Sequence, residues 1–170
     1  ELILKANITN NGVLRYSPSL TTSRLRFEGQ SQEISIGNPI IAYNVLFNNR
    51  TTALSGTLQV DNDADFTKGI LNTRDFGGTL FFNDLADHIN TSNFSFVNGE
   101  VRRSGSLDFV FPIGDTDFYR PLIISALESV NLFSSAYFPE NSKTIFKKIM
   151  QISEHLLAVY MEKGVYNVCT

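Results

Sequence analysis

Residues 43–82 read YNVLFNNRTTALSGTLQVDNDADFTKGILNTRDFGGTLFF, and this stretch decides the fold class. It consists of short apolar runs separated by groups of Asn, Asp and Gly. These three residues tolerate left-handed backbone angles or bond to their own main chain, so they suit tight corners. The stretch therefore predicts a series of short β-strands with a corner after each one.

The same pattern extends over about residues 1–98. Leu25 and Phe27, and then Ile34 and Ile36, alternate with polar residues, which turns one side of each strand inward. Two folds commonly follow from such a series: an antiparallel sandwich, or a solenoid in which each turn of the chain stacks on the last. The corners recur irregularly, roughly every 10–20 residues, so periodicity alone leaves both folds open.

A second stretch, residues 96–138, has closely spaced strand patterns and polar turns. Asn98 and Gly99 form a strong hairpin signal. Leu107, Phe109 and Phe111 alternate with other residues before a loop. This stretch favours a small antiparallel β-sandwich.

The last stretch changes its hydrophobic period. Apolar residues step by four, three, four and four positions at Ile145, Ile149, Ile152, Leu156 and Tyr160. This stripe predicts a helix over residues 143–162, started by a Ser cap and ended by a Gly.

Composition excludes several classes of function. Hydrophobic residues make up 42% of the 170 residues, which is enough for a core, and the net charge of −3 provides no general attraction to nucleic acid or anionic lipid. No apolar run approaches the roughly 20 residues of a membrane helix, and no signal peptide is predicted. We therefore expect no nucleic-acid partner and no membrane insertion. The single cysteine, Cys169, predicts neither an internal disulfide nor a thiolate metal site.

Three aspartates form the main candidate metal site. Asp61, Asp63 and Asp65 supply oxygen donors of the kind that calcium prefers. An EF-hand loop would need Gly at its sixth position and Glu at its twelfth, but these positions are Phe66 and Asn72. A solvated corner is the favoured interpretation, with Ca²⁺ as the weaker alternative; we expect no other cofactor.

The remaining polar clusters predict no catalysis. Asp115 and Asp117 lie near Arg120, with Arg102 and Arg103 within reach across a hairpin, and surface ion pairing is favoured over an acid–base pair. His88 and His155 have no partners at metal-binding spacing, so packing or surface roles are expected.

The 14 Phe and 6 Tyr mostly fit core positions. Asn-x-Ser/Thr triplets, which would be glycan sites only in a eukaryotic protein, begin at Asn7, Asn49, Asn90 and Asn93.

Eight short motifs occur in the sequence in a fixed order. They are NITNNG (7–12), LRFEGQSQEI (25–34), YNVLFNN (43–49), LSGTLQV (54–60), KGILNT (68–73), VNGEVRRSG (97–105), FPIG (111–114) and YRPL (119–122). Together they resemble the repeated segments of large secreted cell-surface proteins of Bacteroidetes, which are typically exported by the type IX system. After Pro139 the chain departs from that family pattern, and it contains no Trp.

The resemblance implies an extracellular, adhesin-like segment of a longer chain, with a parallel β-solenoid leading into a β-sandwich. Combined with the patterns above, it predicts a mainly β fold with three parts: a solenoid-like segment at 1–95, a sandwich-like segment at 96–141, and a C-terminal helix and tail at 142–170. The expected partners are surface glycans, other cell-surface proteins and flanking segments of the same chain.

Two functions follow from these expectations. The first is a non-catalytic structural or adhesive segment, which works by displaying side chains on stacked coils. The alternative is a calcium-dependent polysaccharide-acting enzyme, or a carbohydrate-binding module, on a β-solenoid. Such an enzyme needs a basic residue facing the aspartates, and Lys68 and Arg74 are the nearby cations. The first function is favoured, and no enzyme activity is predicted.

Overall fold

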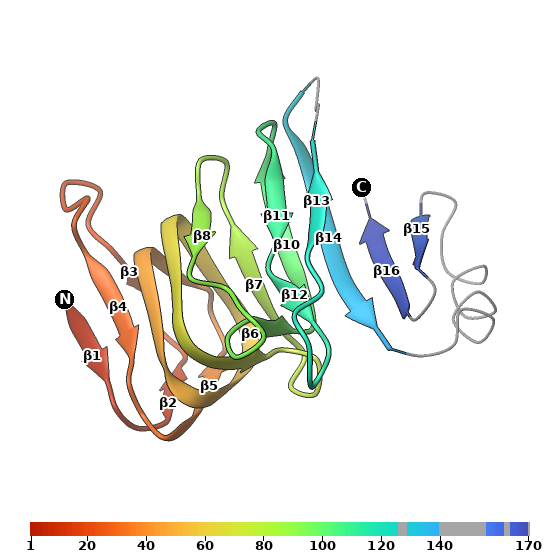
Figure 1. Cartoon of the computed structure of the whole chain (residues 1–170). Helices are drawn as coiled ribbons and strands as arrows, with labels where there is room; N and C mark the ends of the chain where they lie inside the picture. Colours follow the sequence, from red (N-terminus) through yellow and green to blue (C-terminus); the bar gives the residue numbers. More distant parts are fainter. Residues whose placement is uncertain (126–128, 140–155, 162–163, 170) are drawn as a thin grey trace.

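The structure is a computed structural model that describes residues 1–125, 129–139, 156–161 and 164–169. The fold is mainly β, and the chain winds into a β-solenoid of about five turns (Figure 1). The expectation of a mainly β protein with a solenoid is confirmed.

The strands stack in three parallel runs around the coil. The first run contains β1 (Leu2–Leu4), β4 (Arg24–Phe27), part of β6 (Ile40–Asn72) and β8 (Asp87–Ile89). The second contains β2 (Ile8–Asn10), β5 (Ser31–Ile36), further parts of β6, β9 (Val97–Asn98) and β12 (Ile113–Gly114). The third contains β3 (Leu14–Arg15), β6 again, β7 (Gly78–Phe82) and β10 (Val101–Gly105).

Strand β6 belongs to all three runs because it is longer than one turn of the coil. Leu25 pairs with Val45 and Ile34 pairs with Leu54, so one turn takes 20 residues here, whereas β6 has 33. Elsewhere a turn takes between 16 and 26 residues, which accounts for the irregular corner spacing in the sequence.

Stacked rings fill the interior of the coil. Phe27 lies 5.6 Å from Phe47, and Phe47 lies 5.1 Å from Phe66, measured between ring centroids. The column continues through His88, which is 6.2 Å from Phe66 and 5.7 Å from Phe109. All four Phe rings are buried. Such aromatic pairs contribute about 0.5–1.5 kcal/mol each beyond their area burial, so the column joins successive turns.

Two glycines permit the close approach of successive turns. Gly56 and Gly69 have φ angles of 78° and 97°, which residues with a side chain rarely adopt. A Cβ at either position would collide with a carbonyl oxygen 20 residues earlier, that of Ile36 or Asn49. The backbone of one turn therefore packs directly on the previous turn at these positions.

Antiparallel strands end the stack. β14 (Asn131–Phe138) pairs antiparallel with β10, and β16 (Gly164–Cys169) and β15 (Leu156–Met161) extend the same sheet. Separately, β13 (Leu122–Ile124) pairs antiparallel with β11 (Phe109–Phe111). Figure 1 shows these strands at the end of the molecule opposite β1.

The sandwich predicted over 96–141 is not confirmed. Strands β9, β10 and β12 lie in this stretch, and all three pair parallel with earlier turns, so they continue the solenoid. The expected antiparallel strands are present, but they extend the stack.

The helix prediction over 143–162 is wrong for the part that the structure describes. Residues 156–161 form strand β15, which pairs with β16 in a hairpin. The sequence LLAVYM is apolar at every position, so it suits a paired strand as well as a helix face, and pairing with β16 decides between them. Residues 143–155 and 162 lie outside the described residues.

Candidate functional site

A groove lined by both polar and apolar side chains crosses the turns of the coil on the side formed by β2, β5 and part of β6. Its volume is about 570 Å³. It begins at Asn7 in the first turn and passes Glu33, Thr51 and Asn72 before it reaches Thr116. Because each of these residues comes from a different turn, the groove runs along the stack rather than along one strand.

Two loops form a wall at one end of the groove. The loop after β6 carries Phe76, and the loop after β12 carries Thr116. In Figure 1 both loops project from the lower edge of the molecule. The Asn72 side chain donates to Asp75 over 2.8 Å and accepts the backbone N–H of the same residue, which shapes the first loop. The Phe76 ring is left 43% exposed beside the groove.

Buried amides hold the floor of the groove. The Gln32 amide donates to the carbonyl oxygens of Leu4 (3.1 Å) and Ala6 (2.9 Å), and its oxygen accepts the N–H of Gly29 over 2.8 Å. Asn49 donates to the same Gln32 oxygen over 3.0 Å. Buried polar groups of this kind are stable only when bonded, so the network links neighbouring turns rigidly below the groove.

The groove contains neutral hydrogen-bonding groups, one carboxylate, one exposed ring and the aliphatic side chains of Ala53 and Ile70. Asn7 already uses its side-chain oxygen to accept the backbone N–H of Glu33 (3.0 Å), which leaves its amide group as a donor. The exposed Glu33 and Thr51 add acceptors and a hydroxyl. Such a set can bond to a chain of hydroxyl groups while the Phe76 ring packs on an apolar face of the same molecule.

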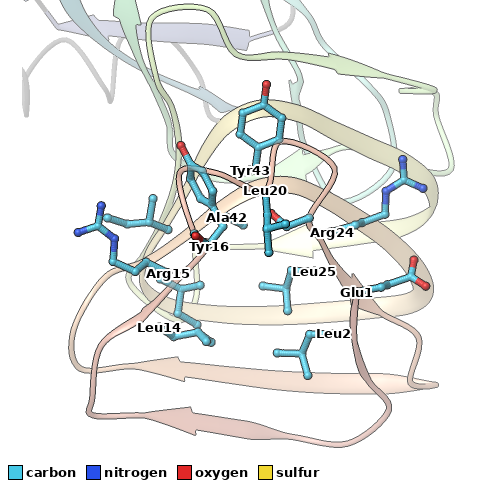
Figure 2. Close-up of a pocket in the computed structure, with 14 residues that line it drawn as sticks. Glu1, Leu2, Leu14, Arg15, Tyr16, Leu20, Arg24, Leu25, Ala42 and Tyr43 are labelled. Atoms are coloured by element: carbon cyan, nitrogen blue, oxygen red, sulfur yellow. The ribbon is translucent and has the colours of Figure 1, made fainter.

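A second, smaller pocket of about 280 Å³ lies at the first turn of the coil. Figure 2 shows Leu2, Leu14 and Leu25 inside the coil, while Glu1, Arg15 and Arg24 are directed away from it. Its lining is mostly apolar, with Leu20, Tyr16 and Tyr43 on the remaining side.

The three aspartates of the calcium prediction lie on one strand. Asp61, Asp63 and Asp65 alternate along β6 with the buried Ala64 between the last two, so they face outward. Alternate residues of a strand are about 6.6 Å apart, and each carboxylate has its own hydrogen-bond donor. The donors are Gln59 and Tyr16 for Asp61, Asn62 for Asp63, and Thr67 and Asn90 for Asp65.

These bonds hold an outward-facing part of strand β6 through nearby side chains. Asp61 raises the pKa of Tyr16, chiefly through a hydrogen bond with its hydroxyl. Over the part of the chain that the structure describes, no group of three His, Cys, Asp or Glu side chains is placed to hold a metal ion. The calcium site stays a prediction.

The Asp115 cluster consists of turn and surface contacts. Asp115 accepts the N–H groups of Asp117 (2.8 Å) and Phe118 (2.7 Å), and it forms an ion pair with Arg120 at 3.5 Å. Arg102 instead pairs with Glu100 at 3.0 Å, and the buried Arg103 donates to the carbonyls of Asn83 and Asp84. The expected ion pairing of Asp115 with Arg120 is present, but the two earlier arginines bind elsewhere.

His88 is a member of the buried ring column. One ring nitrogen, Nε2, contacts the carbonyl oxygen of Val110, and burial lowers the pKa of the imidazole. A packing role for His88 matches the expectation. His155 lies outside the described residues, as does the side chain of Cys169.

The Asn-x-Ser/Thr triplets have different environments. Asn49 is buried and bonded to Gln32 and Thr52, so it is closed to modification in the folded chain. Asn7, Asn90 and Asn93 are exposed.

Sequence reasoning did not single out the groove. In the sequence, Asn72 draws attention only as a corner residue and as the twelfth position of a possible calcium loop, Asn98 only as part of a hairpin signal, and Phe76 has no pattern around it. Glu33 and Ala53 pair in the stack and lie 20 residues apart in the sequence. A search for residues at this spacing is the signal that could have shown which side chains lie next to one another along the groove.

No family model, curated protein or solved structure matches the chain. Within the described ranges, no helix has the length and apolar character needed to span a membrane. The functional argument therefore rests on the fold and the groove.

Proposed function

We propose that the chain is a non-catalytic, adhesive segment of a large bacterial cell-surface protein, and that it binds an extended glycan along this groove. The resemblance to secreted Bacteroidetes surface proteins supports an extracellular location, type IX export and flanking segments of the same chain. The groove is the observation that carries the proposal, since it offers hydrogen-bonding side chains from several successive turns.

The shape of the groove favours a long ligand over a small one. Turns of the coil are about 4.8 Å apart, the usual separation of neighbouring strands. A ligand lying along the stack meets Asn7, Glu33, Thr51 and Asn72 in succession. A repeating chain of sugars presents hydroxyl groups at regular intervals, which matches such a row of amides and hydroxyls.

Phe76 provides the test. Screening of the 170-residue chain on a glycan array, followed by titration calorimetry with the oligosaccharides that bind, should identify soluble ligands. Phe76→Ala should weaken binding about five- to tenfold, the effect of losing about 1–1.4 kcal/mol of ring contact.

Phe94→Ala is the matched control. Phe94 is 84% exposed and does not line the groove, so its replacement should leave affinity unchanged. The absence of glycan binding, or equal effects of the two replacements, would contradict the proposal.

A further inference from the structure

Two neighbouring asparagines in the groove differ in how the fold uses their side chains. Asn72 of β6 and Asn98 of β9 are paired on adjacent turns, and both line the groove. The Asn72 amide donates to the Asp75 carboxylate over 2.8 Å and accepts the Asp75 N–H over 3.3 Å. The loop after β6 therefore already uses both ends of the Asn72 amide.

The Asn98 amide, in contrast, is buried and unpaired. Asn98 is only 5% exposed, and its side-chain oxygen has no hydrogen-bond partner among the described residues. Within these residues the hydrogen bonds of Asn98 use its backbone, whose carbonyl oxygen accepts the N–H groups of Thr73 (3.0 Å) and Arg74 (3.1 Å). A buried amide without a partner costs free energy. Because Asn98 lines the groove, a molecule lying there can supply the missing bonds.

Aliphatic side chains lie close to this amide. Ile70 is two residues before Asn72 on β6, and alternate residues of a strand face the same side, about 6.6 Å apart. Asn98 is the pairing partner of Asn72 on the next turn. Ile70 and Ala53 are both partly exposed and both line the groove. A ligand that reaches the Asn98 amide therefore also meets apolar surface.

Charge narrows the ligand further. Over the part of the chain that the structure describes, Glu33 is the only charged residue that lines the groove, and it is exposed. Asp75 adds a second carboxylate beside Asn72. No Lys, Arg or His among these lining residues offsets the two carboxylates, so an acidic glycan would be repelled.

An acetamido group matches all three features. It is an amide with one N–H and one C=O, so it can exchange two hydrogen bonds with the Asn98 amide. Its methyl group is apolar and can cover Ile70 and Ala53, and it carries no charge that Glu33 would repel. A hydroxyl in the same place can bond to Asn98, but it leaves the aliphatic side chains in contact with water.

We propose that the glycan bound in the groove is an uncharged chain of N-acetylated sugars, and that Asn98 selects it by pairing with an acetamido group. This inference rests on the proposed function, because it names the class of ligand for the same groove.

The test compares oligosaccharides that differ in one substituent. Titration calorimetry of the whole 170-residue chain uses pentamers of N-acetylglucosamine and of glucose with the same linkage, and a pentamer of galacturonic acid. The N-acetylglucosamine pentamer should bind at least about tenfold more tightly than the glucose pentamer, because only the acetamido group both pairs with Asn98 and covers the aliphatic side chains. The galacturonic acid pentamer should bind more weakly than either.

Substitutions at the two asparagines locate the preference. Asn98→Ala should lower it to less than about threefold, chiefly by weakening the binding of the N-acetylated pentamer. Asn72→Ala is the matched control: it removes the same side chain one turn away and releases the loop that carries Phe76, so it should weaken both neutral pentamers and leave their ratio unchanged. Circular dichroism and melting check that the variants fold. Asn98→Asp, which keeps the shape and lacks the N–H donors, should lower the preference as well and provides the same test if the Ala variant unfolds.

The outcomes separate this inference from the proposed function. Equal affinity for the two neutral pentamers, or a preference that survives both substitutions of Asn98, would overturn the inference. The glycan proposal would still stand in that case if Phe76→Ala weakened binding. Binding of other glycans without the N-acetylglucosamine pentamer would also overturn the inference alone, whereas the absence of any glycan binding would overturn both.

Discussion

Individual residues set the distance between turns. Gly56 and Gly69 lie where a side chain would meet the carbonyl oxygen of the preceding turn, and both have positive φ. His88 occupies a place in a column otherwise made of Phe, so one polar ring is packed among apolar ones. Stability therefore depends on a few positions at which either the backbone geometry or the charge of the side chain is constrained.

Gly69→Ala should destabilise the fold by about 1–3 kcal/mol, because the new Cβ meets the Asn49 carbonyl in a strained backbone region. Gly12→Ala is the control. Gly12 has open space around its Cβ position, so the change there should stay within about 0.5 kcal/mol. Urea unfolding of both variants checks this, and equal losses would show that the turns do not pack as described.

His88 should make stability fall in mild acid. Burial lowers the pKa of His88 in the folded chain below its ordinary value of about 6.5. Below that ordinary value the unfolded chain takes up a proton that the folded chain does not, so stability declines from about pH 6.5 toward the lowered pKa. His88→Phe should remove this decline; melting temperatures between about pH 7.5 and 5 for both chains measure it. A His88→Phe chain with an undiminished decline would be inconsistent with a neutral, packed imidazole.

Among the strands, β14 connects the parallel coil to the antiparallel end. Glu100 accepts hydrogen bonds from Ser134 on β14 and from Thr79 on β7, and it pairs with Arg102. Arg74 donates to the Tyr137 carbonyl and stacks on Phe138, 5.2 Å from the ring centroid. Side chains from the loops after β6 and β9 thus hold β14 in place, and Thr79 of β7 and Arg102 of β10 support Glu100.

Glu100→Gln should loosen β14. Burial by itself raises the pKa of Glu100, but the bonds from Ser134, Arg102 and Thr79 outweigh it, so the pKa lies below its ordinary value. The carboxylate therefore stabilises the fold above the ordinary pKa, and this contribution is lost as pH falls through the lowered value. Replacement should cost about 1 kcal/mol and speed hydrogen exchange across Asn131–Phe138, whereas the exposed Asp117→Asn should change neither. Exchange that stays slow would mean that Glu100 does not anchor the strand.

At the scale of the whole molecule, the proposed function depends on side chains that successive turns of the coil place in a row along the stack. The groove collects between one and three side chains from each turn. The groove is therefore a surface that no single strand forms.

Local chemistry was enough to predict several of these features. Alternation at Leu25 and Phe27 predicts strands, and the recurring Asn, Asp and Gly predict corners, because these preferences act within a few residues. Prediction failed where strand pairing, and not the local pattern, decides the structure. The LLAVYM segment became strand β15 by pairing with β16, and strands β9 and β10 joined earlier turns instead of forming a sandwich.

By itself the sequence determined a chain of short strands and corners with an apolar inner face. The choice of a parallel stack, the column through His88, and the groove from Asn7 to Thr116 were decided only by the tertiary structure. The physical reason is that strand pairing is non-local: backbone bonds between residues 20 apart select one register among many that the local pattern allows.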